Sequence, residues 1–301
     1  MKNILKFAAL ICAAGAFAAC TGSGGKTDVG FSLSTLNNPF FASMKDGAES
    51  KSKAINVSVM VTDANDEPAT QTKNIEDLLS KGIKVLIVNP ADSAAVAPTI
   101  REVKSKGIKV IAVDRKVDGV EIDTFIGTDN IAAGQKAGEA FVAAIKASGK
   151  TPVVAVLEGV PGSSSNIERM AGYKKALDTA GIVPVVTQTA NYNRDQGLTV
   201  TENILRGNPD INAIVSMNDE MALGAIAAVK SAGKIPGTDI LVTGFDAGAD
   251  AKAAVQKGEM LFTVEQKTVL MGETAVETAK KFIDGQSVPA NIPITVEIIT
   301  K

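Results

Sequence analysis

Two ten-residue stretches of this chain share one pattern, KGIKVLIVNP at residues 81–90 and KGIKVIAVDR at residues 106–115. In each stretch a Gly stands where a helix commonly ends, and an apolar, β-branched run follows it. The first run ends in Asn89, and the second ends in Asp114 and Arg115. A helix end, an apolar strand and a polar strand end, repeated along the chain, predict consecutive units of a parallel α/β sheet.

The same alternation extends along the whole chain from Lys26. Apolar runs predict strands at residues 29–34, 57–62, 85–88, 110–113, 153–157, 183–187, 213–216 and 240–243. Helical patterns lie between these runs, among them residues 40–53, 69–80, 135–147 and 220–231. Few of the strands alternate apolar with polar residues, so both faces of the sheet should be covered. So many strands favour two doubly wound sheets, the first ending near Gly127, Thr128 and Asp129.

Composition excludes several chemistries. The chain has 301 residues, with 31 Lys and Arg against 33 Asp and Glu, and it contains no His. Without His there is no Ser-His-Asp machinery and no imidazole metal site, and the near-neutral charge argues against nucleic acid as a partner. No segment has the glycines that a phosphate-binding or dinucleotide-binding loop requires. The acidic stretch 63–66 is not followed by a twelve-residue calcium-binding loop with a terminal Glu. We therefore expect no cofactor and no metal.

The first 25 residues have the features of an export signal followed by a tether. Lys2 and Lys6 precede an uncharged stretch, residues 7–19, that is too short to span a bilayer. Phe17 to Cys20 resembles a bacterial lipobox, in which the Cys becomes the lipidated first residue of the mature chain. This predicts an exported protein, periplasmic or on the cell surface, that is held at the membrane by a lipid on Cys20.

Five strand ends carry polar or aromatic residues, and in parallel sheets these ends are where ligands bind. Residues 34–41 come at the end of the first run. Four later runs are followed by Asn89, by Asp114 with Arg115, by Asn218 with Asp219, and by Phe245 with Asp246. Amides, carboxylates and guanidinium groups match the donors and acceptors of sugar hydroxyls. Flat rings match the apolar faces of a sugar ring. The set predicts a site for a neutral polyol.

Each of these features also has a purely structural interpretation. Asn38 and Pro39 form a common helix start, and Phe40 and Phe41 could belong to the core. Asp114 and Arg115 could form a surface ion pair. Two carboxylates in one cleft, Asp114 and Asp246, could also serve a glycosidase, although we regard an exported sugar-modifying enzyme as the weaker alternative.

Five segments resemble the ribose-binding branch of the periplasmic binding protein type 1 family. They are STLNNPFF at 34–41, NPADS at 89–93, VDR at 113–115, NDEMALGA at 218–225 and GFD at 244–246. The likeness follows the chain in order and covers nearly all of it after the leader. In that family, two α/β lobes joined by three hinge strands close over one sugar, which an ABC importer then receives.

The resemblance implies a set of sugar contacts at the matching positions. They are Ser34, Asn38, Phe40, Phe41, Asn89, Asp114, Arg115, Arg169, Asn218, Phe245, Asp246 and Gln266. Tyr192, where that family typically has Phe, is a further candidate. Its hydroxyl leaves the ligand open: D-ribose is favoured, and another pentose, a furanose hexose or a ribose-like signalling molecule are alternatives.

The resemblance also implies two lobes that are discontinuous in sequence. Chain crossings near Thr128, Gln266 and Thr295 would form the hinge. Residues 26–128 with 267–294 would form one lobe, and residues 129–266 with 295–301 the other. We expect a monomeric receptor, without enzymatic activity, whose partners are a monosaccharide and an ABC permease. A chemoreceptor is a further candidate partner.

Overall fold

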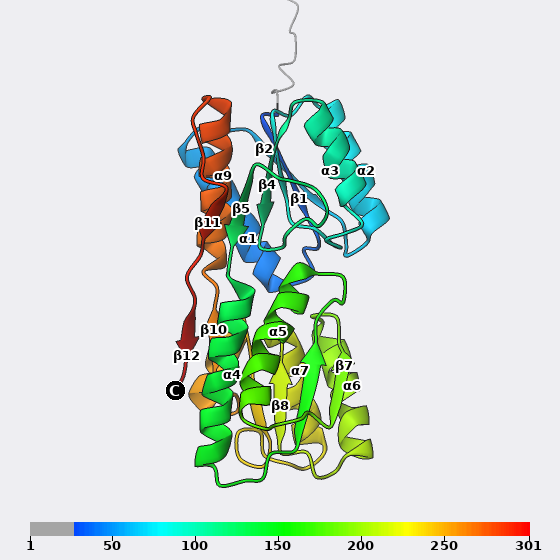
Figure 1. Ribbon diagram of the computed structural model, residues 1–301, viewed down its shortest axis with the longest axis vertical. Helices are drawn as coiled ribbons and strands as arrows, with labels where there is room; N and C mark the ends of the chain where they lie inside the picture. The colour runs from blue at the N-terminus through cyan, green and yellow to red at the C-terminus, as the bar shows by residue number, and fades with distance from the viewer. Residues whose placement is uncertain (1–26) are drawn as a thin grey trace, which may run out of the picture.

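The computed structural model describes residues 27–301 and shows two lobes stacked along the long axis of the molecule (Figure 1). The predicted export signal, the tether and Cys20 lie outside the described residues. None of the helices in the described part is both long and apolar enough to cross a bilayer.

The first lobe, here the N-lobe, is built on a parallel six-stranded sheet. Its strand order is β11-β5-β4-β3-β1-β2. Its strands are β1 (Val29–Leu33), β2 (Val59–Asp63), β3 (Val85–Val88), β4 (Lys109–Val113), β5 (Thr124–Gly127) and β11 (Asn291–Pro293). Its helices are α1 (Pro39–Ala54), α2 (Pro68–Ser80), α3 (Ala97–Ser105) and α9 (Thr268–Ile283).

The second lobe, here the C-lobe, contains a parallel four-stranded sheet and a short antiparallel pair. The four-stranded order is β7-β6-β8-β9, and β10 pairs with β12. Its strands are β6 (Val154–Glu158), β7 (Val186–Thr189), β8 (Ala213–Ser216), β9 (Leu241–Thr243), β10 (Thr263–Glu265) and β12 (Glu297–Ile299). Its helices are α4 (Asn130–Ala147), α5 (Ser164–Thr179), α6 (Arg194–Gly207), α7 (Asp219–Ser231) and α8 (Ala249–Lys257).

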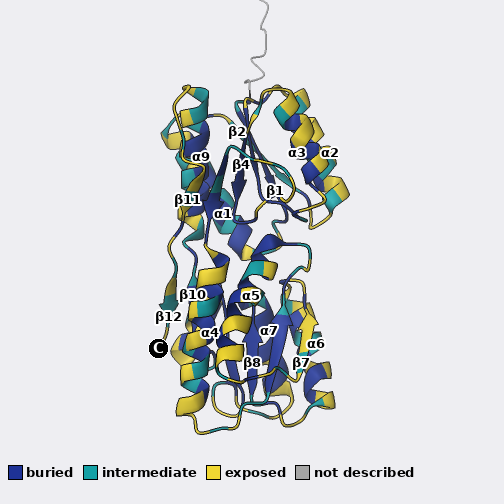
Figure 2. Cartoon of the chain, viewed as in Figure 1, coloured by how far each residue is buried: buried dark blue, intermediate teal, exposed yellow. Residues whose placement is uncertain are grey.

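Successive residues of the central N-lobe strands enter opposite sides of the sheet. In β3, Val85 and Ile87 join the apolar cluster that includes residues of α1 and α9, whereas Leu86 and Val88 join the cluster beneath α2 and α3. All four are buried, and Figure 2 shows the neighbouring strands β1 and β4 mainly in the dark blue of buried residues. The prediction of doubly wound parallel sheets is therefore confirmed, because a strand without polar residues is covered on both faces.

Three pairs of helices pack so closely that their backbones touch. A Cβ on Gly47 of α1 would lie 2.3 Å from the carbonyl oxygen of Val269, and one on Gly272 of α9 would lie 1.9 Å from that of Met44. Reciprocal glycines of the same kind join α4 to α5 and α6 to α7: Gly134, Gly172, Gly197 and Gly224. Any side chain at these positions would push the paired helices apart.

The chain passes between the lobes at three places. It crosses from β5 to α4, from β10 to α9, and from β11 to β12. At the second crossing Lys267 adopts a left-handed conformation, with φ of 54°, immediately before α9. The Lys267 ammonium lies 2.8 Å from the Glu297 carboxylate, so an ion pair joins the second crossing to the third.

The predicted strand at residues 183–187 is wrong in position. The strand β7 begins only at Val186, and Val183 is 80% exposed. Pro184 has no backbone N–H to donate to a neighbouring strand, so the apolar run Val183 to Val186 starts as an exposed loop.

Candidate functional site

The loop after β1 brings two aromatic rings to the edge of the N-lobe sheet. The Asn38 side chain accepts a hydrogen bond of 2.9 Å from the backbone N–H of Phe40, and Pro39 begins α1. This helix start fixes Phe40 and Phe41, whose rings meet edge to face with 5.1 Å between centroids. Both rings are buried and both line the cavity between the lobes. Asn38 is thus a helix cap and a cavity residue at once.

Asp114 and Arg115 follow β4 and are buried, with exposures of 4% and 2%. A surface ion pair is therefore excluded. The Asp114 carboxylate accepts a 3.2 Å hydrogen bond from the Asn89 side chain and lies 3.9 Å from Arg115 Nε. Burial raises the pKa of Asp114 above its ordinary value, while Arg115 and Arg169 act to lower it.

The Arg115 guanidinium lies between one ring of each lobe. Its central carbon is 5.1 Å from the Phe41 ring centroid and 5.7 Å from that of Tyr192. Nη1 donates to the carbonyl oxygen of Pro90 at 2.9 Å. These contacts hold the cation across the cleft, where it faces both lobes.

Arg169, from α5, supplies the cation of the C-lobe. Its Nε and Nη2 donate to Asn130 Oδ1 at 3.3 and 3.0 Å, and Nη1 donates to the carbonyl oxygen of Met217. The guanidinium carbon stacks 3.6 Å from the centroid of the Phe245 ring. Phe245 is fully buried beneath this cation, so it supports Arg169 and does not form a wall of the cavity.

Asp246 and Gln266 lie together where β9 and β10 end. Gln266 Nε2 donates to Asp246 Oδ1 at 2.7 Å. Burial raises the pKa of Asp246 well above its ordinary value, Arg169 opposes this, and the neighbouring Asp219 adds to it. Asn218 caps α7 and also donates to the carbonyl oxygen of Tyr192 at 3.5 Å.

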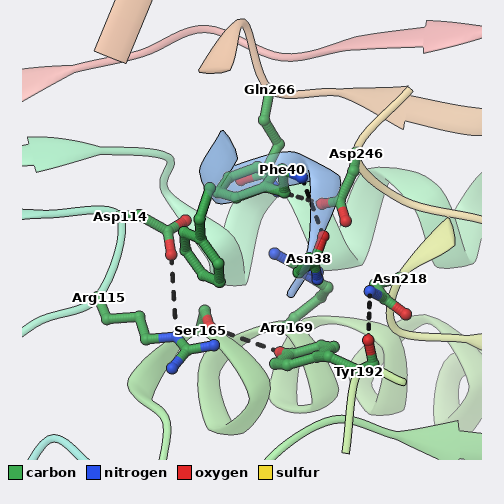
Figure 3. A pocket seen from close by; sticks show the side chains of 11 residues that line it. Asn38, Phe40, Asp114, Arg115, Ser165, Arg169, Tyr192, Asn218, Asp246 and Gln266 are labelled. Carbon is green, nitrogen blue, oxygen red and sulfur yellow. Dashed lines mark hydrogen bonds and ion pairs between the residues drawn. The ribbon is translucent and has the colours of Figure 1, made fainter. Parts of the chain in front are cut away.

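These side chains surround one cavity between the lobes (Figure 3). It is lined by Asn38, Phe40, Phe41, Asp114, Arg115, Ser165, Arg169, Tyr192, Asn218, Asp246 and Gln266. Among the described residues, two buried lining atoms, Arg115 Nε and Gln266 Oε1, have no hydrogen-bond partner. Both are available to a polar ligand.

Three candidate residues lie outside this lining. Besides Phe245, they are Ser34 and Asn89, which are buried against each other: Ser34 N donates to Asn89 Oδ1 at 3.3 Å. Asn89 also donates to the carbonyl oxygen of Val113, so it ties the ends of β1 and β4 together. Its side chain also donates to Asp114, so Asn89 positions that carboxylate in this conformation.

Ser165 also lines the cavity, although it is not among the residues predicted from the sequence. It lies in the first turn of α5, two residues after the helix cap Ser163, and is almost fully buried. Its hydroxyl lies 3.4 Å from that of Tyr192. The signal that could have identified it is the run of three serines, Ser163 to Ser165. This run lies in the loop and helix start that follow β6, and the other site residues likewise follow strands.

Direct hydrogen bonds join the lobes beside the cavity. Ser93 N donates to the carbonyl oxygen of Gly162 at 3.0 Å, and Ser164 N donates to Ser93 Oγ at 3.1 Å. Lys116 N donates to Ser164 Oγ at 2.7 Å, and its ammonium pairs with Glu168 at 2.5 Å. We call these five residues the inter-lobe clasp. It shows that the lobes are closed on each other.

Comparisons with known proteins agree with this architecture. A family model described as "Periplasmic binding protein domain" matches residues 29–287. The "Ribose import binding protein RbsB" of Bacillus subtilis is 39% identical over 93% of this chain and 90% of that protein. The protein of the same name from Escherichia coli is 35% identical over 99% of both chains. A Caulobacter myo-inositol binding protein, solved with myo-inositol, superposes with a TM-score of 0.86 at 35% identity, covering 92% of this chain and 94% of that one.

Proposed function

The chain belongs to the periplasmic binding protein family, and we propose that it is an exported receptor that captures D-ribose between its lobes and delivers it to an ABC transporter. The observation that carries this proposal is the cavity between the lobes, to which both lobes contribute hydrogen-bonding side chains and rings. Like the import binding proteins to which it is related, it is a binding protein and not an enzyme.

Sugar binding and lobe closure are one equilibrium in this proposal. The N-lobe contributes Phe40, Phe41, Asp114 and Arg115, and the C-lobe contributes groups that include Arg169. A sugar that touches both sets binds the closed form better than the open form, so it shifts the population towards closure. Neither lobe alone should bind well.

The energetics of such a site are attainable without covalent chemistry. A micromolar dissociation constant corresponds to about −8 kcal/mol. Spread over the ~10 heavy atoms of a pentose, this is ~0.8 kcal/mol per atom, below the ceiling of ~1.5 for very small ligands. Each buried sugar hydroxyl left without a partner costs about 1–3 kcal/mol, so the polar lining decides which sugar fits.

A related sugar is the second candidate ligand, and the Tyr192 hydroxyl at the cavity wall favours it. Solved relatives show how widely this fold varies its ligand. An Actinobacillus succinogenes binding protein, 32% identical with a TM-score of 0.83 and covering 92% of this chain and 98% of that one, holds D-allose.

We further propose the lobe boundaries and the anchor. Residues 26–128 with 267–294 form one lobe and residues 129–266 with 295–301 the other, in keeping with the sheets that β11 and β12 join. We propose that the receptor acts as a monomer, attached to the membrane by a lipid on Cys20. Mass spectrometry of the native N-terminus and a Cys20→Ser variant test the anchor: an unmodified N-terminus overturns it.

A thermal-shift panel of sugars on residues 26–301 tests the ligand. A sugar at 100 times its dissociation constant adds about 2.7 kcal/mol to the free energy of unfolding. D-ribose should give the largest shift among pentoses, hexoses and myo-inositol. A larger shift with another sugar overturns the ribose assignment, and no shift with any sugar overturns the receptor proposal.

A further inference from the structure

The Tyr192 side chain is held against the cavity by its backbone and by a glycine. Asn191 and Tyr192 both have left-handed backbones, with φ of 50° and 57°. Asn tolerates this conformation, but it is unfavourable for a bulky Tyr, so the surrounding loop must enforce it at Tyr192. The ring lies flat on Gly159, where a Cβ would come within 2.1 Å of Tyr192 Cζ. Only Gly at 159 leaves room for the ring.

The Tyr192 hydroxyl meets the Ser165 hydroxyl at the cavity wall. The two oxygens are 3.4 Å apart, both residues are buried, and both line the cavity (Figure 3). Asn166, beside Ser165, accepts a 2.8 Å hydrogen bond from Gly159 N. The start of α5 and the floor beneath the ring are thus fixed relative to each other.

Two hydroxyls in contact use only one O–H between them. The pair therefore keeps a second O–H donor and spare lone pairs. Other polar groups of the C-lobe are partly committed: Arg169 donates to Asn130 and Met217, and Asn218 donates to the backbone of Tyr192. The pair thus adds a neutral group, able to donate and to accept, on the C-lobe side of the cavity.

We propose that Tyr192 and Ser165 together recognise one hydroxyl of the bound sugar and so determine which sugars the receptor accepts. This inference rests on the proposed function. A site built to hydrogen-bond a hydroxyl rejects an analogue that lacks it, because buried polar groups are then left without partners. Phe at position 192 would keep the flat ring but lose this discrimination.

Calorimetric titration of Tyr192→Phe and Ser165→Ala with D-ribose and its single-deoxy analogues tests the pair. Tyr192→Phe should weaken D-ribose binding about tenfold. For the one analogue that lacks the recognised hydroxyl, Tyr192→Phe and the native protein should bind with nearly the same affinity. The double variant should lose less than the sum of the two single variants, because both remove one contact.

Tyr173→Phe is the matched control, since Tyr173 is the other tyrosine of the chain and lies in the C-lobe core, outside the cavity lining. The chain contains no Trp, so its fluorescence comes from these two tyrosines. Sugar should change the emission of the native protein and of Tyr173→Phe, whereas Tyr192→Phe should show no change.

The outcomes separate the two proposals. If Tyr192→Phe binds every sugar as the native protein does, or loses the same factor for every analogue, the pair does not read a hydroxyl. In either case the receptor function stands. If the native protein binds none of the sugars, both proposals are overturned.

Discussion

The two lobes present different charge arrangements to the same cavity. In the N-lobe, the Asp114 carboxylate lies 3.9 Å from the guanidinium of its chain neighbour Arg115. In the C-lobe, Asp246 is partly buried and lines the cavity, and Asp219 is buried behind it. The buried cation of the described residues there is Arg169, which donates to neutral oxygens. The N-lobe half of the site therefore sets its carboxylate beside a guanidinium, whereas the C-lobe half, counted with Asp219 behind the lining, has two carboxylates and one guanidinium that pairs with neither.

This difference assigns different tasks to the lobes. A compensated half keeps its geometry without ligand, because each charged group already has a counter-charge. An acid-rich half gains more from hydroxyl donors and is more sensitive to protonation. Substitutions in the N-lobe should therefore act mainly on binding, and substitutions in the C-lobe should act on pH dependence as well.

The largest expected effect comes from Asp219, behind the C-lobe half. Burial is the main cause that raises its pKa from 3.8 to about 6, although Thr263 and the backbone donate to it. The folded state thus holds this proton more tightly than the unfolded chain does. The resulting stability is fully present below pH ~4 and is lost as the pH rises through ~6, about 3 kcal/mol in all.

Urea denaturation of the native protein and of Asp219→Asn between pH 4 and pH 7 measures this contribution. The native protein should lose about 2.4 kcal/mol relative to the variant over that range. Parallel stability curves for the two proteins would contradict the assignment of this pH dependence to Asp219.

Asp114→Ala should cause the largest loss of binding. It removes acceptors for sugar hydroxyls and leaves Arg115 without its carboxylate beside the cavity. We expect a loss of about 2 kcal/mol or more, roughly 30-fold in the dissociation constant by calorimetry. Asp77→Ala, an exposed carboxylate on α2, is the control. Unchanged affinity would remove Asp114 from the site.

Asp246→Asn, the C-lobe counterpart, should cost less. Burial already raises the pKa of this carboxyl well above its ordinary value, so a neutral amide resembles its protonated form. The amide oxygen can still accept the hydrogen bond from Gln266. We expect binding at pH 7 to weaken about fivefold to tenfold. A loss as large as that of Asp114→Ala would erase the proposed difference between the lobes.

Ser164→Ala, in the inter-lobe clasp, should give the smallest effect. Its hydroxyl accepts from Lys116 across the lobes and does not line the cavity. The loss should be about 1 kcal/mol, roughly fivefold, and equal for every sugar, because it weakens the closed state itself. Ser105→Ala, at an exposed position of α3 where the hydroxyl bonds to Glu102 within the helix, should have no effect. A loss that varies with the sugar would place Ser164 in ligand recognition.

The sequence predicts the structure best where burial and strand position act together. The strands β3 and β8 span the predicted residues 85–88 and 213–216, because each is a short apolar run buried on both faces. Most of the residues proposed at strand ends meet at one cavity, as the geometry of parallel sheets requires.

The strands and site residues that the sequence did not predict depend on contacts between distant segments. The strands β11 and β12 have three residues each and mixed polarity, so only their partners β5 and β10 identify them. Phe245 follows a strand like the other candidates, but Arg169 covers it. The role of Ser165 depends on Tyr192, which is 27 positions away.

The paired glycines have a mechanical consequence. Because the backbones of α1 and α9, of α4 and α5, and of α6 and α7 are in direct contact, no compressible layer of side chains separates them at those points. Each half of the molecule should then move as a stiff body, with flexing confined to the few peptide units around Thr128, Lys267 and Thr295. The speed with which the captured molecule is released would thus be tunable at three short stretches of chain, without altering the chemistry that selects it.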